Sequence, residues 1–315
     1  MYIFGWIAVS VVFLLVLLLI YVSWLLFSLA CAKDIPKVIK PMMDNLLTGY
    51  VPEGNAEVEA GYAFYNESKR ETWTVSSFDG LRLYAEFIPC ENARATILLM
   101  HGYRSDPLHD FSAVLPYYNS LGLNILMCEQ RAHVRSEGKY ITFGVLERFD
   151  VLSWTEEINR RIGKDTPIIL DGISMGASTV LFSTDTALPD NVAGFIADCG
   201  YSSAKSQIIH VMGLMKLPVY PFYPLANAVC RLIAKFSFSD SDAVSNVSKT
   251  NIPCLLIHGE ADDFVPCTNV RDIYSACNGK KHLFLCPDAS HGMSYLTQMD
   301  KCKKMLSDFI DEVLG

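Results

Sequence analysis

The 315-residue sequence has no run of basic residues, no C-x-x-C pair among its ten cysteines and no internal repeat. With a net charge of −8, the lack of a basic run argues against a nucleic acid as partner. The cysteine spacings fit neither a disulfide framework nor a metal site, and several cysteines, such as Cys128 and Cys254, lie in apolar runs. We therefore expect reduced, buried thiols that act as small apolar side chains, and no metal or cofactor.

Charged side chains are absent from the whole segment between Tyr2 and Ala32. About 20 apolar residues are enough for a helix to cross a bilayer, and this run is longer. Two alternatives are a cleaved signal peptide and a lipoprotein signal, because Ala30-Cys31-Ala32 resembles a cleavage site. However, no Lys or Arg precedes the run, which also exceeds the roughly 7–15 apolar residues of a signal peptide. We therefore predict an uncleaved transmembrane anchor over residues 1–32.

Positive charge follows this anchor at Lys33, Lys37 and Lys40, whereas only the α-amino group precedes it. The positive-inside rule then predicts a single-pass protein of the cell membrane with its globular part in the cytoplasm. Residues 33–70 are predicted to be a connector, because prolines and glycines interrupt them. A short helix is one interpretation of Met42 to Leu47.

Beyond residue 70, short apolar runs alternate with helical patterns. Asp79-Gly80 is a turn signal between the runs 72–77 and 81–88, and it predicts an antiparallel hairpin. Runs rich in Ile, Leu or Val, typical of strands buried on both faces, follow at 96–100, 125–128, 168–170, 192–197, 254–257 and 282–285. Helical candidates lie between or after them at 107–120, 147–162, 174–186, 270–277 and 293–313. Residues 71–315 are therefore predicted to form an α/β domain, with a mostly parallel sheet and helices on both faces.

One interval is longer than a single crossover helix requires. About 50 residues separate the strand runs at 192–197 and 254–257, and the segment 208–238 is apolar and aromatic. Prolines divide this segment into short helical pieces. We predict a cap at about 201–240, inserted over the carboxyl edge of the sheet with an apolar pocket beneath it. An ordinary helix pair packed on the core is the alternative.

The pentapeptide Gly172-Ile173-Ser174-Met175-Gly176 stands between an apolar run and a helical stretch. A serine between two glycines at such a junction is typical of a nucleophile elbow. Its hydroxyl needs a base that is itself held by a carboxylate. His291 follows the last strand and can reach back to Ser174, so it is the candidate base. The acid is expected between them in the sequence, where Asp262 is the first candidate and Asp263 the alternative.

An oxyanion that forms during attack needs two hydrogen-bond donors. The amide of Met175, directly after the candidate nucleophile, is one candidate. The amide of Tyr103 is the other, because Gly102 permits a tight bend after the strand at 96–100. An ordinary turn at the end of that strand is the alternative interpretation.

Together these motifs resemble the α/β-hydrolase superfamily, and in particular a bacterial branch of esterases, lipases and serine aminopeptidase-like enzymes. The resemblance covers residues 70 to 315 and rests on His101-Gly102-Tyr103, Glu129-Gln130-Arg131-Ala132-His133, the Ser174 pentapeptide, the Asp262 segment and Ser290-His291-Gly292. It implies a catalytic triad of Ser174, Asp262 and His291, with Tyr103 and Met175 as oxyanion donors.

One position departs from the family pattern. Val134 stands in a turn where the family usually carries glycine. A β-branched residue tolerates a positive φ badly, so we expect this turn to be reshaped or strained.

The sequence therefore predicts a membrane-anchored serine hydrolase that cleaves an ester or thioester bond of a small acyl substrate through an acyl-enzyme. The apolar cap and the anchor are the reasons for expecting a lipophilic substrate. Two alternatives remain: a serine peptidase, and a catalytically silent membrane scaffold that binds a partner.

Overall fold

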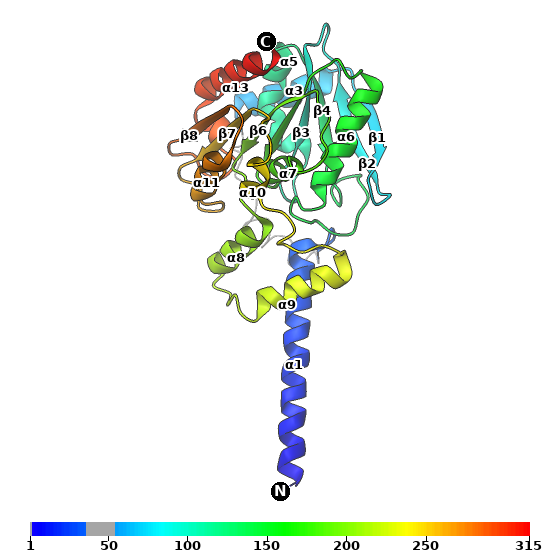
Figure 1. Cartoon of the computed structure of the whole chain (residues 1–315), viewed down its shortest axis with the longest axis vertical. Coiled ribbons are helices and arrows are strands. Elements are labelled where there is room, and N and C mark those ends of the chain that lie inside the picture. The colour runs from blue at the N-terminus through cyan, green and yellow to red at the C-terminus, as the bar shows by residue number, and fades with distance from the viewer. Residues whose placement is uncertain (1, 36–53) are drawn as a thin grey trace.

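The computed structural model describes residues 2–35 and 54–315 (Figure 1). Eight strands form one sheet in the order β1-β2-β4-β3-β5-β6-β7-β8. Strand β2 is antiparallel to both of its neighbours, and every other neighbouring pair is parallel. The predicted mostly parallel sheet and its antiparallel hairpin are both confirmed. The strands are β1 (Glu71–Ser76), β2 (Arg82–Ile88), β3 (Ala95–Met100), β4 (Leu123–Glu129), β5 (Ile168–Ile173), β6 (Val192–Asp198), β7 (Cys254–Gly259) and β8 (Lys281–Cys286).

The central strands are apolar on both sides because helices cover both faces of the sheet. Successive residues of β3 alternate between two hydrophobic clusters: Ile97 and Leu99 belong to one, Leu98 and Met100 to the other. The helices on the Ile97 face are α3 (Ala56–Glu67), α4 (Pro107–Phe111), α5 (Leu115–Ser120), α12 (Ser294–Thr297) and α13 (Met299–Leu314). Those on the Leu98 face are α6 (Glu147–Arg161), α7 (Met175–Ser183), α10 (Ala243–Val247) and α11 (Thr268–Ala276).

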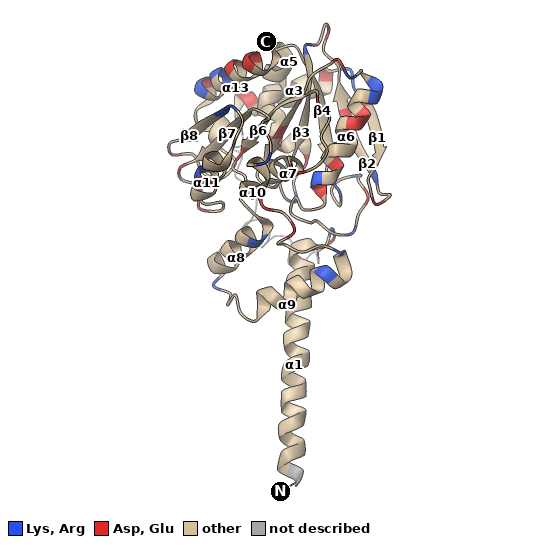
Figure 2. Cartoon of the chain, viewed as in Figure 1, with Lys and Arg blue, Asp and Glu red and all other residues tan. Residues whose placement is uncertain are grey.

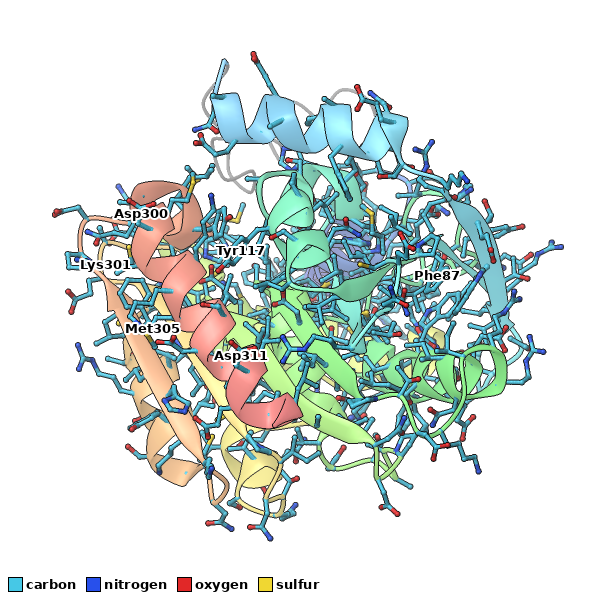
Figure 3. All side chains as sticks on the ribbon, turned by 90° about the horizontal axis from the view of Figure 1, so that it is seen from above. Phe87, Tyr117, Asp300, Lys301, Met305 and Asp311 are labelled. Carbon is cyan, nitrogen blue, oxygen red and sulfur yellow. The ribbon has the colours of Figure 1, made fainter. Side chains whose placement is uncertain are left out.

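Figure 3 looks down on the end of the molecule where α3 and α13 lie. The labelled Tyr117 and Met305 both pack on the Ile97 face, and the Tyr117 hydroxyl donates to the carbonyl of Lys303 (2.8 Å). The last predicted helix, 293–313, is in fact two helices, because the backbone turns at Gln298 (φ −134°, ψ 55°). The predicted helix at 107–120 is likewise divided, by a 3₁₀ turn at Ser112–Val114.

Part of the predicted connector at 33–70 is helical, which the sequence analysis missed. Helix α3 begins after Asn55, whose side-chain oxygen accepts hydrogen bonds from the backbone amides of Glu57 and Val58 (3.1 Å each). Gly61, one of the glycines that predict an interruption, is buried in this helix. A Cβ on Gly61 would lie 1.8 Å from the carbonyl oxygen of Ser112, so the glycine allows close packing. The helix suggested for Met42 to Leu47 lies outside the described residues.

Helix α1 (Tyr2–Cys31) extends from the globular head as a single rod (Figure 1). It is the one helix in the described part of the chain that is long and apolar enough to cross a membrane. Its final turns, however, belong to the core of the head, since Phe27 and Cys31 are buried there. The Ile141 amide donates to the Cys31 carbonyl (2.6 Å), and the rings of Phe27 and Tyr140 are 5.3 Å apart.

The long interval between β6 and β7 holds α8 (Ala204–Leu214) and α9 (Phe222–Val229), which runs on into a π-helical turn, Cys230–Ala234. These helices lie between the head and the exposed part of α1 (Figure 1), and α9 packs against α1. Helix α8 is hydrogen-bonded to the loop after β7. The side-chain amide of Gln207 donates to the carbonyl of Phe264 (2.8 Å), and His210 Nε2 is 2.9 Å from the carbonyl oxygen of Asp263.

A buried arginine joins three parts of the head. Arg131, which follows β4, donates twice to Asp150 on α6 (2.6 Å each) and to Asp79 in the β1–β2 turn (2.9 and 3.2 Å). Asp150 is as deeply buried as the guanidinium. The pair is therefore a charge-assisted contact in a region without solvent, where each charge depends on the other.

Arg131→Leu should destabilise the protein strongly, because it leaves the Asp150 carboxylate buried without a counter-ion. Breaking a buried pair in this way costs about 3–5 kcal/mol. The double variant Arg131→Leu/Asp150→Leu removes both charges and should regain part of that loss. Thermal unfolding in detergent, followed by circular dichroism, measures both effects. A double variant no more stable than the single one would contradict this interpretation.

Candidate active site

Side chains from three loops meet at the carboxyl edge of the sheet. Ser174 follows β5, Asp262 follows β7 and His291 follows β8. His291 Nε2 lies 2.8 Å from Ser174 Oγ, and His291 Nδ1 lies 2.7 Å from Asp262 Oδ2. The structure thus brings the three predicted residues into one hydrogen-bonded chain. Asp263, the alternative acid, instead contacts His210 of α8 through its backbone carbonyl.

The surroundings of Asp262 determine which nitrogen of His291 carries the proton. Asp262 Oδ1 accepts hydrogen bonds from the amides of residues 264–265 (2.9 and 2.8 Å). Burial acts to raise the pKa of Asp262, but hydrogen bonds from His258, His291 and the amide groups lower it below its usual value. An ionised carboxylate can only accept, so His291 Nδ1 carries the hydrogen and Nε2 is left to accept the proton of Ser174.

Ser174 has a backbone conformation that is rare for a residue with a side chain, at φ 56° and ψ −115°. The neighbouring glycines make this turn feasible. A Cβ on Gly172 would lie 2.3 Å from the backbone of Gly176, and a Cβ on Gly176 would lie 1.8 Å from the carbonyl oxygen of Met100. The first turn of α7 therefore lies directly against the end of β3, with Ser174 at the sharp junction.

The two predicted oxyanion donors lie next to this junction. Met175 is the first residue of α7. Gly102 precedes Tyr103, and a Cβ on it would lie 3.6 Å from Ser174 Cβ, so this loop passes beside the serine. Neither the Met175 amide nor the Tyr103 amide donates to another described residue. Both groups are available to an acceptor that enters the site.

Asp110, which the sequence analysis missed, holds the loop of Tyr103 in place. It accepts hydrogen bonds from the Gly102 amide (2.6 Å) and from Ser105 Oγ (2.5 Å), and His109 Nδ1 is 3.0 Å away. Burial acts to raise the pKa of Asp110, but these partners lower it. The available signal was its position in the helix directly after a glycine-containing loop.

His258, at the end of β7, lies behind the candidate acid. Its Nε2 is 2.8 Å from the carbonyl oxygen of Val265 and 3.4 Å from Asp262 Oδ2. Its Nδ1 is buried without a hydrogen-bond partner among the described residues. His258 thus contacts both the loop of Asp262 and the carboxylate oxygen that is bonded to His291.

The expected strain at Val134 is present, because its φ is 40°. Such conformations cost on the order of 1–3 kcal/mol. Lys33, just after α1, donates to the carbonyls of Val134 (3.3 Å) and Ser136 (2.9 Å). His133 Nε2 accepts from the Arg104 amide (3.0 Å). The strained turn therefore joins the end of α1 to the loop beside Ser174.

Arg104 makes a second and larger contact with α1. Its guanidinium donates to the carbonyls of Leu29, Ala32 and Lys33 (3.1, 2.7 and 3.1 Å). The Tyr103 hydroxyl donates to one more carbonyl of the same turn (2.7 Å). Carbonyls at the C-terminal end of a helix carry partial negative charge, which favours a cation. The end of α1 is therefore bonded to the residues of the candidate oxyanion loop.

A cavity of about 270 Å³ adjoins Ser174 and His291. It runs between α4 and α12, and its apolar lining includes Val58, Phe111, Val114, Ile196, Leu296 and Leu306. Contrary to expectation, none of its described lining residues belongs to the cap segment 201–240, because the cap packs on α1 and on the loop after β7 instead. The cap therefore contributes no described residue to the wall of this cavity.

Two buried carboxyl groups also line this cavity. Asp171 accepts a hydrogen bond from the Tyr118 hydroxyl (2.6 Å), and Asp198 accepts one from Ser294 Oγ (3.2 Å). Burial raises the pKa of Asp171 to about 7 and that of Asp198 to about 6. Near neutral pH these groups can carry protons, so the cavity wall is less anionic than its composition indicates.

Asp262 and His291 also belong to a group of side chains that could hold a metal ion. Cys199, Asp262 and His291 each place one ligand atom within 4.8 Å of the others. Burial, however, raises the pKa of the Cys199 thiol well above its usual range, so it stays protonated and is a poor ligand. The other two side chains already bond each other. The geometry favours the hydrogen-bonded chain from Ser174 to Asp262.

Gly176→Ala should disrupt the junction at Ser174, because the new methyl group would overlap the Met100 carbonyl of β3. We expect a thermal midpoint several degrees lower and a displaced α7. Gly213→Ala, in α8, is the matched control: its Cβ meets nothing within 4 Å and should leave stability unchanged or improved. Equal midpoints for the Gly176 variant and the native protein would contradict the close approach.

Asp171→Asn should reduce the loss of stability with rising pH. The pKa of Asp171 is higher in the folded protein than in the unfolded chain, so its stabilising contribution is complete below about pH 4 and is lost as the pH rises through 7. At roughly 1.4 kcal/mol per pKa unit, the change is at most about 4 kcal/mol. Thermal midpoints of both proteins from pH 4.5 to 8 measure the slope. Parallel slopes would show that Asp171 is not the group responsible.

Comparison of the sequence with known proteins identifies distant relatives. Residues 231–314 match the family model described as PhoPQ-activated pathogenicity-related protein. YfhR of Escherichia coli K12 is 26% identical over 309 residues, which cover 91% of this chain and 99% of YfhR. YqkD of Bacillus subtilis is 23% identical, with 79% and 82% covered. The membrane protein YNL320W of Saccharomyces cerevisiae is 22% identical, with 77% and 80% covered.

Solved structures also resemble the chain. The esterase Pf2001 of Pyrococcus furiosus has a TM-score of 0.65 at 20% identity, covering 85% of this chain and 98% of its own. The α/β hydrolase GrgF from Penicillium has a TM-score of 0.61 at 12% identity, covering 78% and 99%. An acylaminoacyl peptidase of Pyrococcus horikoshii has a TM-score of 0.59 at 18% identity, covering 81% of this chain but 43% of its own. With its strand order, its turn at Ser174 and these neighbours, the chain has the α/β-hydrolase fold.

Proposed function

We propose that the protein is a membrane-anchored serine hydrolase that cleaves an ester or thioester bond of an acyl substrate. The observation that carries this proposal is the hydrogen-bonded chain from Ser174 Oγ through His291 to Asp262, with 2.8 and 2.7 Å between the bonded atoms. Esterases among the structurally similar proteins support it, because they show that this fold holds such an activity.

In the proposed reaction Ser174 Oγ attacks the carbonyl carbon while His291 Nε2 takes the hydroxyl proton. Asp262 stabilises the imidazolium that results. The amides of Met175 and Tyr103 bind the oxyanion of the tetrahedral intermediate. When the intermediate collapses, His291 gives the proton to the leaving alcohol or thiol, and the acyl group stays on Ser174. Water, deprotonated by His291, then releases the acid and restores the serine.

The proposed anchor is α1, whose span Phe4–Cys31 has 28 residues and almost no buried side chains over its most apolar window. A relative described as a membrane protein supports this placement. Lys33, Lys37 and Lys40 follow the span, so the proposed orientation has the head in the cytoplasm at the cell membrane. The proposed substrate is a small acyl compound, whose apolar part fits the largely apolar cavity beside Ser174.

A peptidase is the second candidate, since one structural neighbour is described as an acylaminoacyl peptidase. This chain matches less than half of that protein's length, however, so the remainder of the peptidase has no counterpart in the comparison. The esterase proposal requires no such additional part, and we prefer it for that reason.

Ser174→Ala should abolish covalent labelling by a fluorophosphonate and lower the hydrolysis of short-chain p-nitrophenyl esters by roughly 10⁴-fold or more. Ser275→Ala, an exposed serine on α11, is the matched control and should label and turn over normally. Circular dichroism checks that each variant is folded. If the native protein is not labelled, the scaffold alternative is favoured. Faster turnover of aminoacyl amides than of esters would favour the peptidase.

A further inference from the structure

Exposed apolar side chains gather on the cap. Outside α1, the described part of the chain exposes eight large apolar side chains, and five of these lie between residues 214 and 233. We call these five the cap patch: Leu214, Met215, Tyr220, Leu232 and Ile233. Two of them, Tyr220 and Leu232, are more than 70% exposed. Single exposed apolar residues are ordinary on a protein surface, but a group of this kind in one short segment marks an interaction site.

The cap differs from the rest of the chain in charge. No Asp or Glu occurs between Asp198 and Asp240, whereas Lys205, Lys216, Arg231 and Lys235 do. The segment between the two aspartates therefore carries +4, in a chain whose net charge is −8. Figure 2 shows the same contrast: α8 and the helical turn that follows α9 carry basic but no acidic colour. A surface with both apolar and basic side chains fits an anionic lipid surface.

The position of the cap relative to α1 also favours a lipid surface as its partner. The exposed apolar side chains of α1 extend from Phe4 to Trp24, and the 21 residues of this stretch, at 1.5 Å each, span about 31 Å. This length equals the roughly 30 Å of a bilayer's hydrocarbon core. Trp6 stands near one end of this part, and Tyr21 and Trp24 at the other, as is typical of the two membrane interfaces. The bilayer therefore ends close to Trp24.

The cap lies at that level. Helix α9 crosses α1 where α1 enters the head, and the loop between α8 and α9 reaches further along α1 than any other described part of the head (Figure 1). Leu214, Met215 and Tyr220 belong to the end of α8 and to this loop, and Leu232 and Ile233 follow α9. A soluble partner would have to displace lipid headgroups to reach these side chains.

We propose that the cap is inserted in the interface of the same membrane that α1 spans, with the cap patch among the lipid chains and the four basic residues beside anionic headgroups. The inference rests on the proposed anchoring by α1. Because α8 is bonded to the loop of Asp262 through Gln207 and His210, an inserted cap also holds the candidate active site at the membrane surface. Lipophilic esters are concentrated there.

The test places an environment-sensitive fluorophore, NBD, on single introduced cysteines of the full-length protein in lipid vesicles. The two partly exposed native cysteines, Cys90 and Cys267, are first replaced by serine. Labels at Tyr220→Cys and Leu232→Cys report on the cap. A label at Lys304→Cys on α13, at the end of the head opposite α1, is the aqueous control (Figure 1). A label at Leu14→Cys, midway along the exposed part of α1, is the membrane control.

In vesicles containing phosphatidylglycerol, we expect the labels at 220 and 232 to emit at shorter wavelength than the label at 304. They should be quenched by a spin label attached high on the lipid chain and protected from aqueous iodide. Replacing Lys216, Arg231 and Lys235 by Gln should weaken this protection, and so should vesicles of phosphatidylcholine alone. Both results depend on lipid contact and not on hydrolytic activity, so they are independent of the esterase assay.

Each contrary result has a separate meaning. If the label at 14 is quenched deep in the bilayer while those at 220 and 232 respond to iodide as the label at 304 does, α1 spans the membrane and the cap proposal is wrong. If the label at 14 is also accessible to iodide, the anchoring itself is wrong, and the cap proposal fails with it. Insertion that is the same in both kinds of vesicle would overturn the role of the basic residues.

Discussion

The candidate site depends on how closely the start of α7 can approach the end of β3. Ser174 occupies a junction at which the backbone of residue 176 touches the backbone of residue 100, a contact only glycine allows. The serine is consequently held at a positive φ, and its hydroxyl faces the imidazole of His291. The same approach brings the loop of Gly102 beside the serine. One packing constraint thus positions both the candidate nucleophile and the proposed oxyanion donors.

The other side chains of the site are fixed by hydrogen bonds to loop backbone. Asp262 is held by the amides of its own loop and supported by His258, while Asp110 holds the loop of Tyr103. In each case a buried carboxylate is bonded to amides that the fold would otherwise leave unpaired. Such bonding fixes short loops at the carboxyl edge of a parallel sheet, where functional groups of α/β proteins gather.

Most of the fold could be predicted because its strands are buried on both faces, so their apolar runs are unbroken and short. The number of strands, the hairpin and the alternation of strands with helices could be predicted from residues 71 onward. The order of the strands in the sheet could not, because no local pattern encodes it. The features that could not be predicted from the sequence depend on contacts between distant segments. Gly61 looks like an interruption in sequence and is a close-packing position in space. The meeting of Ser174, Asp262 and His291 was predicted from motifs. Asp110 has only its position after a glycine-containing loop as a signal, and His258 has no local pattern that distinguishes it.

The buried end of α1 has a consequence for how the protein is made. The residues around Cys31 resemble a cleavage site in sequence, but here their carbonyls are bonded to Arg104 and the thiol lies in the core. Cutting there would remove part of the domain's interior and not merely a tether. The end of α1 can be packed only after its partners Tyr140 and Ile141, more than a hundred residues later in the sequence, have been synthesised. Completion of the domain's interior is thus coupled to the docking of α1.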